Sequence, residues 1–142
     1  MTHTPSRQLI LASTSVYRRQ LLERLRVPFA VISPEVDESA LVGELPEPLA
    51  RRLALAKAQA VAVQHPDAVV IGSDQVADLA GTALGKPHTH ARAVEQLQRM
   101  RGQTVIFQTA VAVVCQATGF SQVDLAAVSV RFKLLTDAQI EH

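Results

Sequence analysis

Asp74 is the residue whose setting in this sequence best suits catalysis. Its carboxylate follows the apolar run Ala68–Ile71, which predicts a buried strand, and comes directly after Gly72 and Ser73. A carboxylate at the end of such a strand can bind a cation or take a proton from water. The alternative is an Asx turn, in which the same side chain only caps the strand.

Hydroxyl and guanidinium groups form a second candidate site between Ser13 and Arg19. The strand predicted over Gln8–Ala12 ends here, and the helix predicted over Arg18–Leu25 begins. Helix N-termini attract anions, and arginine forks match phosphate oxygens. Arginines at this end of a helix oppose its macrodipole unless an anion binds there. The segment therefore fits a phosphate site, and the alternative is an N-cap followed by solvent-exposed arginines.

Two of the three lysines could also contact phosphate. Lys57 lies at the margin of the apolar face of the helix predicted over Pro48–Gln64, where snorkelling toward solvent is the alternative. Lys86 lies between Gly85 and Pro87 in a predicted turn, and its alternative is an ordinary surface turn. Position alone does not separate these alternatives.

The charges lie in two opposed clusters. Residues 1–34 carry five arginines and one acid, whereas residues 35–47 carry five acids and no base. A basic segment suits a polyphosphate and an acidic segment suits a divalent cation, and metal-assisted phosphate chemistry needs both. The alternative is two solvated faces that keep the protein in solution.

A mixed α/β architecture must position these groups. The chain is expected to form one domain over residues 1–142, with helices on a twisted sheet, and a helix start at Thr136–Gln139 that stops at His142 suggests truncation at the C-terminal end. Periodicity, turn residues and capping signals predict the following further elements: strands at Phe29–Ile32, Val76–Leu79, Thr104–Cys115 and Val123–Lys133, a loop over Ser33–Pro46, and a helix from Thr89 through Met100.

Composition excludes several classes of protein. With 142 residues, 48% of them hydrophobic, and a net charge of +1, the chain can form one core but lacks the charge of a general nucleic-acid binder. No apolar stretch approaches the length of about 18 residues that spans a bilayer, so no membrane partner is expected. Cys115 is alone in an apolar run, which predicts a reduced thiol and a cytoplasmic location.

Five motifs in order resemble the Maf family of nucleoside triphosphate pyrophosphatases. They are Leu-Ala-Ser-Thr-Ser-x-x-Arg-Arg from Leu11, Pro-Glu-Val-Asp-Glu from Pro34, Ala-x-x-Lys-Ala from Ala54, Ile-Gly-Ser-Asp-Gln from Ile71, and Gly-Lys-Pro from Gly85. The resemblance implies an elongated, two-lobed fold like that of inosine triphosphatases, with a central cleft. It also implies hydrolysis of the α–β phosphate bond of a nucleoside triphosphate, assisted by a divalent cation of the Mg or Mn class.

The resemblance assigns a role to each candidate residue. Asp74 becomes the catalytic carboxylate and a metal ligand, and Glu35 a second metal-facing acid. The implied contacts to the substrate phosphates are Ser13, Arg18, Arg19, Lys57 and Lys86. Val16 stands where the family usually has proline, and the family's carboxy-terminal segment is absent after His142.

Within the family, Gly-Ser-Asp-Gln resembles the subgroup that hydrolyses 7-methyl-GTP to 7-methyl-GMP and diphosphate. Tyr17 and Gln75 occupy the positions expected to discriminate the base, and an aromatic ring can stack on a cationic methylated purine. The alternatives are a dTTP or UTP pyrophosphatase of the same family and a non-catalytic nucleotide-binding regulator of septum formation. A homodimer joined at an exposed sheet edge is also expected.

Overall fold

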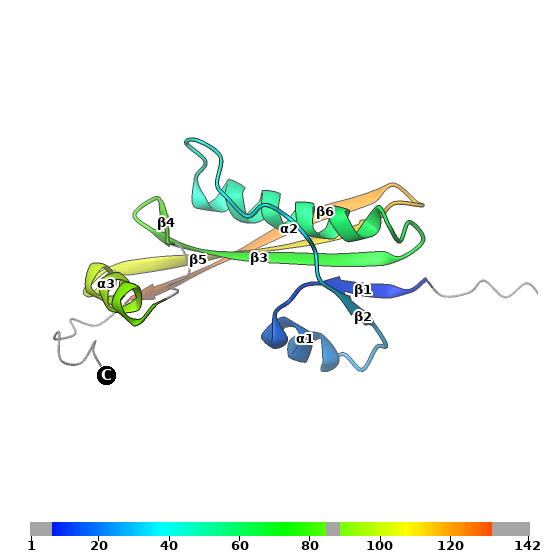
Figure 1. Ribbon diagram of the computed structural model, residues 1–142, viewed down its shortest axis with the longest axis horizontal. Coiled ribbons are helices and arrows are strands. Elements are labelled where there is room, and N and C mark those ends of the chain that lie inside the picture. The colour runs from blue at the N-terminus through cyan, green and yellow to red at the C-terminus, as the bar shows by residue number, and fades with distance from the viewer. Residues whose placement is uncertain (1–6, 85–88, 132–142) are drawn as a thin grey trace, which may run out of the picture.

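A computed structural model of the chain describes residues 7–84 and 89–131. Lys86, Lys133 and the helix predicted to start near Thr136 lie outside these ranges. In the described part the elements are, in chain order, β1 (Leu9–Ala12), α1 (Val16–Glu23), β2 (Ala30–Ile32), α2 (Pro46–Ala62), β3 (Val69–Leu79), β4 (Thr82–Leu84), α3 (His90–Met100), β5 (Thr104–Cys115) and β6 (Phe120–Arg131) (Figure 1).

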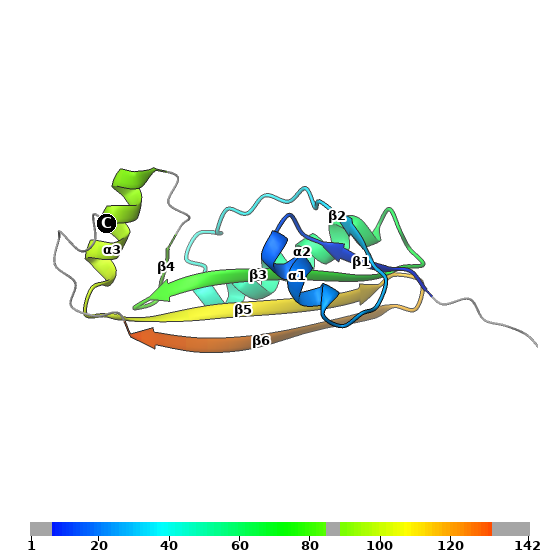
Figure 2. The ribbon, with the colours of Figure 1, turned by 90° about the horizontal axis from the view of Figure 1, so that it is seen from below.

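The strands form one mixed sheet, as the sequence predicts. Its order is β2-β1-β3-β5-β6, and β4 pairs with the far end of β3. β1 is parallel to both of its neighbours, whereas β5 is antiparallel to β3 and to β6. β3, β5 and β6 run side by side along the length of the molecule, which gives it an elongated shape (Figure 2).

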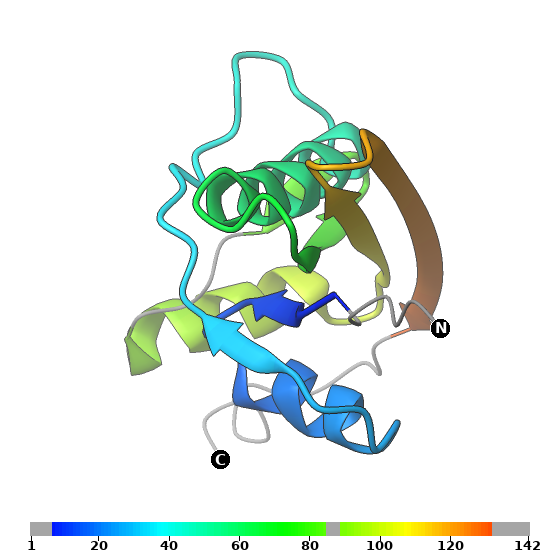
Figure 3. The ribbon, with the colours of Figure 1, turned by 90° about the vertical axis from the view of Figure 1, so that its right-hand side faces the viewer.

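Helices lie on both faces of this sheet. α2 covers one face, and α1 lies on the opposite side of the sheet, next to β1 and β2 (Figure 3). α3 lies at the far end, near β4 (Figure 1). The core fills the layer between α2 and the sheet, and its largest members include Ile10, Leu49, Leu53, Val61, Val70 and Val114. No helix in the described ranges is long and apolar enough to cross a membrane.

Helix α2 packs very closely on β3 at Gly72. A Cβ atom at this position would meet the backbone oxygen of Ala54 and would lie 2.7 Å from the backbone nitrogen of Ala58. Only glycine permits this approach, because the clash would be with backbone atoms that cannot rotate away. The contact holds the middle of α2 directly above the strand that carries Asp74.

Two helices begin two residues earlier than the sequence suggests. α1 begins at Val16 because the Ser15 hydroxyl accepts a hydrogen bond from the Arg18 N–H at 3.2 Å and caps the helix. α2 begins at Pro46 rather than Pro48, and proline suits the first turn, where its missing N–H has no partner to lose. The helix predicted to open at Thr89 is confirmed, with the Thr89 hydroxyl accepting from the Arg92 N–H.

The prediction of separate strands over Ala68–Ile71 and Val76–Leu79 is wrong. β3 runs unbroken over Val69–Leu79, and β5 pairs with it from Val70 to Leu79. The polar residues stay in the strand because this ladder satisfies their backbone groups, and the Ser73 hydroxyl also donates to the Ala110 carbonyl at 2.8 Å. β6 likewise begins at Phe120, three residues before the predicted start.

Candidate active site

The site forms where β3 has no neighbouring strand on one side. β1 pairs with β3 only as far as Gly72, and β4 pairs with it only from Ala77 onward. Among the described residues, positions 73–76 therefore lack a strand partner on this side, while β5 pairs with them on the other. The open edge leaves room beside Asp74 for a ligand and for side chains from α1 and α2.

Lys57 lies between two carboxylates at this edge. Its Nζ atom is 3.0 Å from Oδ1 of Asp74 and 2.7 Å from Oε1 of Glu38. The side chains of Lys57 and Asp74 are only 12% and 10% exposed, whereas that of Glu38 is 55% exposed. Lys57 therefore does not snorkel into solvent, and Asp74 is not the cap of a turn.

The buried carboxyl of Asp74 has a raised pKa. Burial is the main cause, and the hydrogen bond and positive charge of Lys57 partly oppose it. The negative charge of Glu38 raises the pKa further, and the positive charge of Arg18 lowers it. A carboxylate with a raised pKa is a better proton acceptor than an exposed one, which is the property that a general base needs.

The β1–α1 turn brings Arg18 to the same region. Ser13 is buried and its hydroxyl accepts a hydrogen bond from the Ser15 N–H at 3.0 Å, while the Ser15 hydroxyl caps α1. These bonds fix the start of the helix, so that Arg18 faces the sheet and its charge acts on Asp74. In this structure Ser13 shapes the turn, and Arg18 supplies the charge.

A pocket of about 450 Å³ lies on the opposite face of the sheet from α2, between α1 and the strands β3 and β5. Its wall is largely aliphatic, and its polar lining consists of Ser15, Tyr17, Arg18, Ser73, Gln75 and Thr109. The Gln75 amide donates to the Thr109 hydroxyl at 3.0 Å. The pocket therefore contains both residues that the resemblance assigns to base discrimination, and Arg18 belongs to the pocket and to the surroundings of Asp74.

Two other predicted site residues lie elsewhere. Arg19 forms an ion pair with Glu23 one turn along α1, at 3.1 Å, and lines a different hollow, formed with residues 27–31. Glu35 is exposed on the loop between β2 and α2. The acid of this loop that contacts Lys57 is Glu38, three residues further along.

Sequence reasoning did not single out Glu38. It lies in the acidic segment and in the Pro-Glu-Val-Asp-Glu motif, so the acid that contacts Lys57 comes from the segment that the sequence singled out. Its spacing could not indicate which acid turns inward, because the loop has no regular period. Val36, two residues before Glu38, is partly buried against the core and fixes the path of the loop here.

The donor set near Asp74 suits a small hard cation. Both carboxylates touch the same ammonium nitrogen, so Asp74 and Glu38 offer oxygen ligands within a few ångströms of each other. Mg²⁺ is commonly bound by one or two carboxylates together with substrate phosphates. Among the described residues no group of three or more acidic, histidine or cysteine side chains is placed to hold a metal alone. The residues thus fit a cation that is shared with a phosphate substrate.

Two solved structures have folds similar to that of this chain. A structure from Mycobacterium abscessus, described as a nucleoside-triphosphatase or dITP/XTP pyrophosphatase, matches with a TM-score of 0.57 at 17% identity, over 90% of this chain and 75% of that one. A HAM1 protein from Coxiella burnetii matches with a TM-score of 0.57 at 15% identity, over 87% and 72% of the two chains. These matches establish the fold class.

Sequence relatives are much closer. A protein of Albidiferax ferrireducens is 66% identical over 99% of this chain and 71% of its own length, and one from a Polaromonas species is 66% identical over 96% and 63%. A third, from Aromatoleum aromaticum, is 57% identical over 94% and 69%. All three carry the name 7-methyl-GTP pyrophosphatase. The family described as Maf-like protein matches residues 8–142, and the chain therefore belongs to the Maf family.

Proposed function

We propose that this protein is a nucleotide pyrophosphatase whose substrate is 7-methyl-GTP. The observation that carries the proposal is the buried Asp74 carboxylate, held 3.0 Å from Lys57 at an open strand edge. Relatives up to 66% identical bear the name of this activity. Because the chain spans 71% and 63% of the lengths of the first two relatives, the proposal concerns the whole enzyme.

The reaction needs a water molecule activated beside an anhydride. In the proposed mechanism the Asp74 carboxylate accepts a proton from water while the water oxygen bonds to the α-phosphorus. The bond from that phosphorus to the bridging oxygen breaks, and diphosphate leaves with the electron pair. Lys57 and Arg18 bind the phosphate oxygens and offset the charge that develops on them.

A divalent cation fits this scheme. Glu38 and Asp74 would hold it together with substrate oxygens, and Glu38 replaces Glu35 as the proposed second acid. The cation would neutralise charge on the phosphates. Lys57 would remain close to both carboxylates, and from there its ammonium group would bind the phosphate oxygens of the substrate.

The nucleobase of the substrate is proposed to occupy the pocket beside α1. There Tyr17, whose ring is largely exposed, can stack on the methylated purine, and Gln75 offers an amide to its polar edge. The phosphates would then cross the open edge of β3 toward Asp74, past Arg18. The buried thiol of Cys115 fits the reducing cytoplasm, where we place the reaction.

A screen for diphosphate release tests the proposal directly. Purified protein, with and without Mg²⁺ or Mn²⁺, is offered 7-methyl-GTP, GTP, dTTP and UTP. Faster turnover of 7-methyl-GTP supports the proposal, and faster turnover of dTTP or UTP would instead indicate the pyrimidine subgroup. Binding of nucleotide without release of diphosphate from any of them would favour a regulatory protein.

A further inference from the structure

We infer that Arg52 is a positioning residue for the proposed reaction, because it fixes the loop that holds Glu38 against Lys57. The inference rests on the proposed function of the Asp74 site. Arg52 and Lys57 both belong to α2, and the loop between β2 and α2 passes both of them. Arg52 itself does not contact Asp74; it is proposed to act through Glu38.

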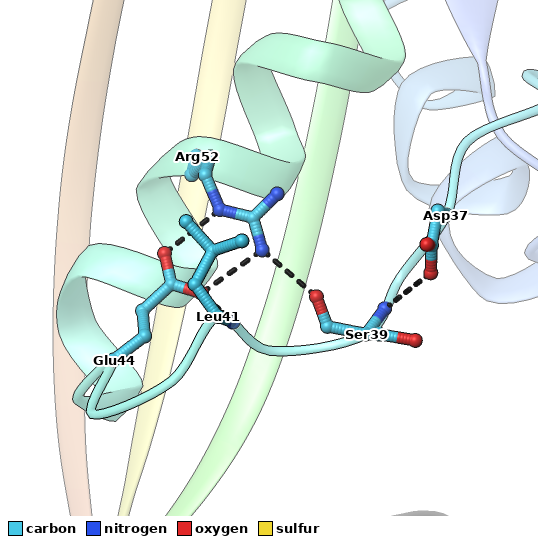
Figure 4. A network of polar contacts seen from close by, with 5 residues as sticks. All are labelled: Asp37, Ser39, Leu41, Glu44 and Arg52. Atoms are coloured by element: carbon cyan, nitrogen blue, oxygen red, sulfur yellow. Dashed lines mark hydrogen bonds and ion pairs between the residues drawn. The ribbon is translucent and has the colours of Figure 1, made fainter.

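Arg52 makes a two-pronged contact with the loop (Figure 4). Its Nε atom donates to Oε2 of Glu44 at 2.8 Å, and its Nη2 atom donates to Oε1 of Glu44 at 2.9 Å. The same Nη2 atom also donates to the Ser39 carbonyl at 2.9 Å. The Glu44 side chain is only 9% exposed. The Arg52 side chain is 34% exposed, so the pair is partly buried, and a bidentate pair of this kind fixes geometry better than a fully exposed, single-contact ion pair.

Further hydrogen bonds hold the backbone that follows Glu38. Ser39 follows Glu38, and its carbonyl is held by Arg52 while its N–H donates to Oδ1 of Asp37 at 2.9 Å. Oε1 of Glu44 also accepts the Leu41 N–H at 3.0 Å. The backbone directly after Glu38 is therefore held in place, and the Asp37 side chain before it is tied to Ser39, which limits where the half-exposed Glu38 side chain can reach.

The two acids of the loop have different tasks. Glu44 is buried against Arg52, and the hydrogen bond from Arg52 lowers its pKa, so it remains ionised and paired. Glu38 is more exposed and contacts Lys57. Glu44 thus anchors the loop, and Glu38 reaches the site that the anchor positions.

Arg51 provides a matched comparison. It is the adjacent residue of α2, and its ion pair with Glu47, at 3.3 Å, stays within the helix at i and i+4. Arg51→Met removes the same charge and a similar side chain without releasing the loop. Because Arg52→Met leaves the largely buried Glu44 carboxylate without its cation, Arg52→Met/Glu44→Gln is made as well, to keep folding intact.

The first measurement is amide hydrogen exchange over residues 37–44, which needs no substrate. Arg52→Met and Arg52→Met/Glu44→Gln should speed exchange at the Ser39 and Leu41 amides, with α2 and the sheet unchanged. Arg51→Met should match the parent protein. Unchanged exchange in the loop of both Arg52 variants would overturn the inference.

The second measurement is a double-mutant cycle on diphosphate release from 7-methyl-GTP. We expect Arg52→Met to lower kcat/KM by roughly ten- to hundredfold, and Glu38→Gln to lower it by a similar factor, since small misplacements in a site cost this much. The double variant Arg52→Met/Glu38→Gln should lose little more than Glu38→Gln alone, because both changes remove one interaction. Losses that multiply in the double variant, or an equal loss in Arg51→Met, would contradict a role through Glu38. If the parent protein hydrolyses no nucleotide, the proposed function fails, and the exchange measurement alone decides whether Arg52 fixes the loop.

Discussion

The ammonium of Lys57 and the carboxylate of Asp74 meet at 3.0 Å because the helix and the strand that carry them pack backbone against backbone. Gly72 lies two residues before Asp74, on the same face of β3, and a side chain there would meet Ala54 and Ala58 of α2. The absence of a side chain at Gly72 therefore allows Lys57 and Asp74 to come this close.

Gly72→Ala should damage both stability and activity. We expect unfolding in urea to require about 1–3 kcal/mol less free energy, because the added methyl group forces α2 away from β3. Diphosphate release per folded molecule should fall as well, since Lys57 moves with α2. Gly119→Ala is the comparison: its surroundings are open, its φ of +72° makes alanine unfavourable, and it should lower stability alone. Normal turnover by folded Gly72→Ala would contradict the link between packing and the site.

Asp74→Asn should abolish diphosphate release and leave the fold intact. The amide keeps the size of the side chain but cannot accept the proton, and loss of a general base costs on the order of 10²–10⁴ in rate. Asp78→Asn changes the same residue type four positions along β3, where the carboxylate accepts from the Gly81 N–H at 2.8 Å. Circular dichroism should show that both variants are folded, and turnover measurements should show that only Asp74→Asn is inactive. A folded, nearly fully active Asp74→Asn protein would show that Asp74 is not the general base of the reaction.

Arg18→Ala and Lys57→Ala should weaken triphosphate binding more than monophosphate binding. Their proposed partners are phosphate oxygens that the monophosphate product has lost, and each charge-assisted contact contributes about 1.5–3 kcal/mol. Calorimetry with 7-methyl-GTP and 7-methyl-GMP measures the difference. Arg19→Ala should have a smaller effect, because Arg19 is paired with Glu23. Equal losses for both nucleotides would show that the phosphate assignment is incorrect.

Tyr17→Ala should reduce the preference for 7-methyl-GTP over GTP. Methylation makes the purine cationic and strengthens its attraction to an aromatic face by about 0.5–2 kcal/mol. The ratio of the two kcat/KM values should therefore fall in Tyr17→Ala and be retained in Tyr17→Phe, which keeps the ring. A parallel decrease for both nucleotides would place Tyr17 outside the base site.

The acid limb of the pH–rate profile should lie above 3.8, the ordinary pKa of an aspartate. Asp74 must be ionised to accept a proton, and because its pKa is raised, activity is lost at a higher pH as the solution is acidified. Neighbouring charges should move this limb in opposite directions. Glu38→Gln removes a negative charge and should shift it to lower pH, whereas Arg18→Ala removes a positive charge and should shift it to higher pH. If the acid limb lies at the same pH in both variants, it reports the ionisation of a group other than Asp74.

The sequence indicated which residues lie near one another at the candidate site, but it did not indicate their geometry. Asp74, Lys57 and Arg18 were identified from residue type and position, and the structure brings them together at one edge of β3. The strand itself was divided wrongly, because Gly72 and the polar residues after it resemble a turn. Only pairing with a distant strand, β5, keeps this segment extended, and local patterns do not contain that information.

Loop residues were harder still to predict. Glu35 and Glu38 belong to one acidic motif, and no helical or strand period indicates which of them faces the site. The answer depends on the contacts of Arg52 and Val36 with neighbouring parts of the fold. Lys86, which the sequence also suggested, lies outside the described ranges.

Because β3 is unbroken, residues 73–75 alternate between the two faces of the sheet, and this bears on how the preferred nucleotide could be changed. Successive side chains of a strand point to opposite faces, so Asp74 faces α2 and Lys57, while Ser73 and Gln75 line the pocket beside α1. In the proposed mechanism the strand therefore separates the site of bond cleavage from the pocket that selects the nucleobase. If the proposed roles hold, substitutions at Gln75 would reshape the pocket beside α1 without repacking the surroundings of Asp74, so this position is where we expect specificity to change while hydrolysis is preserved.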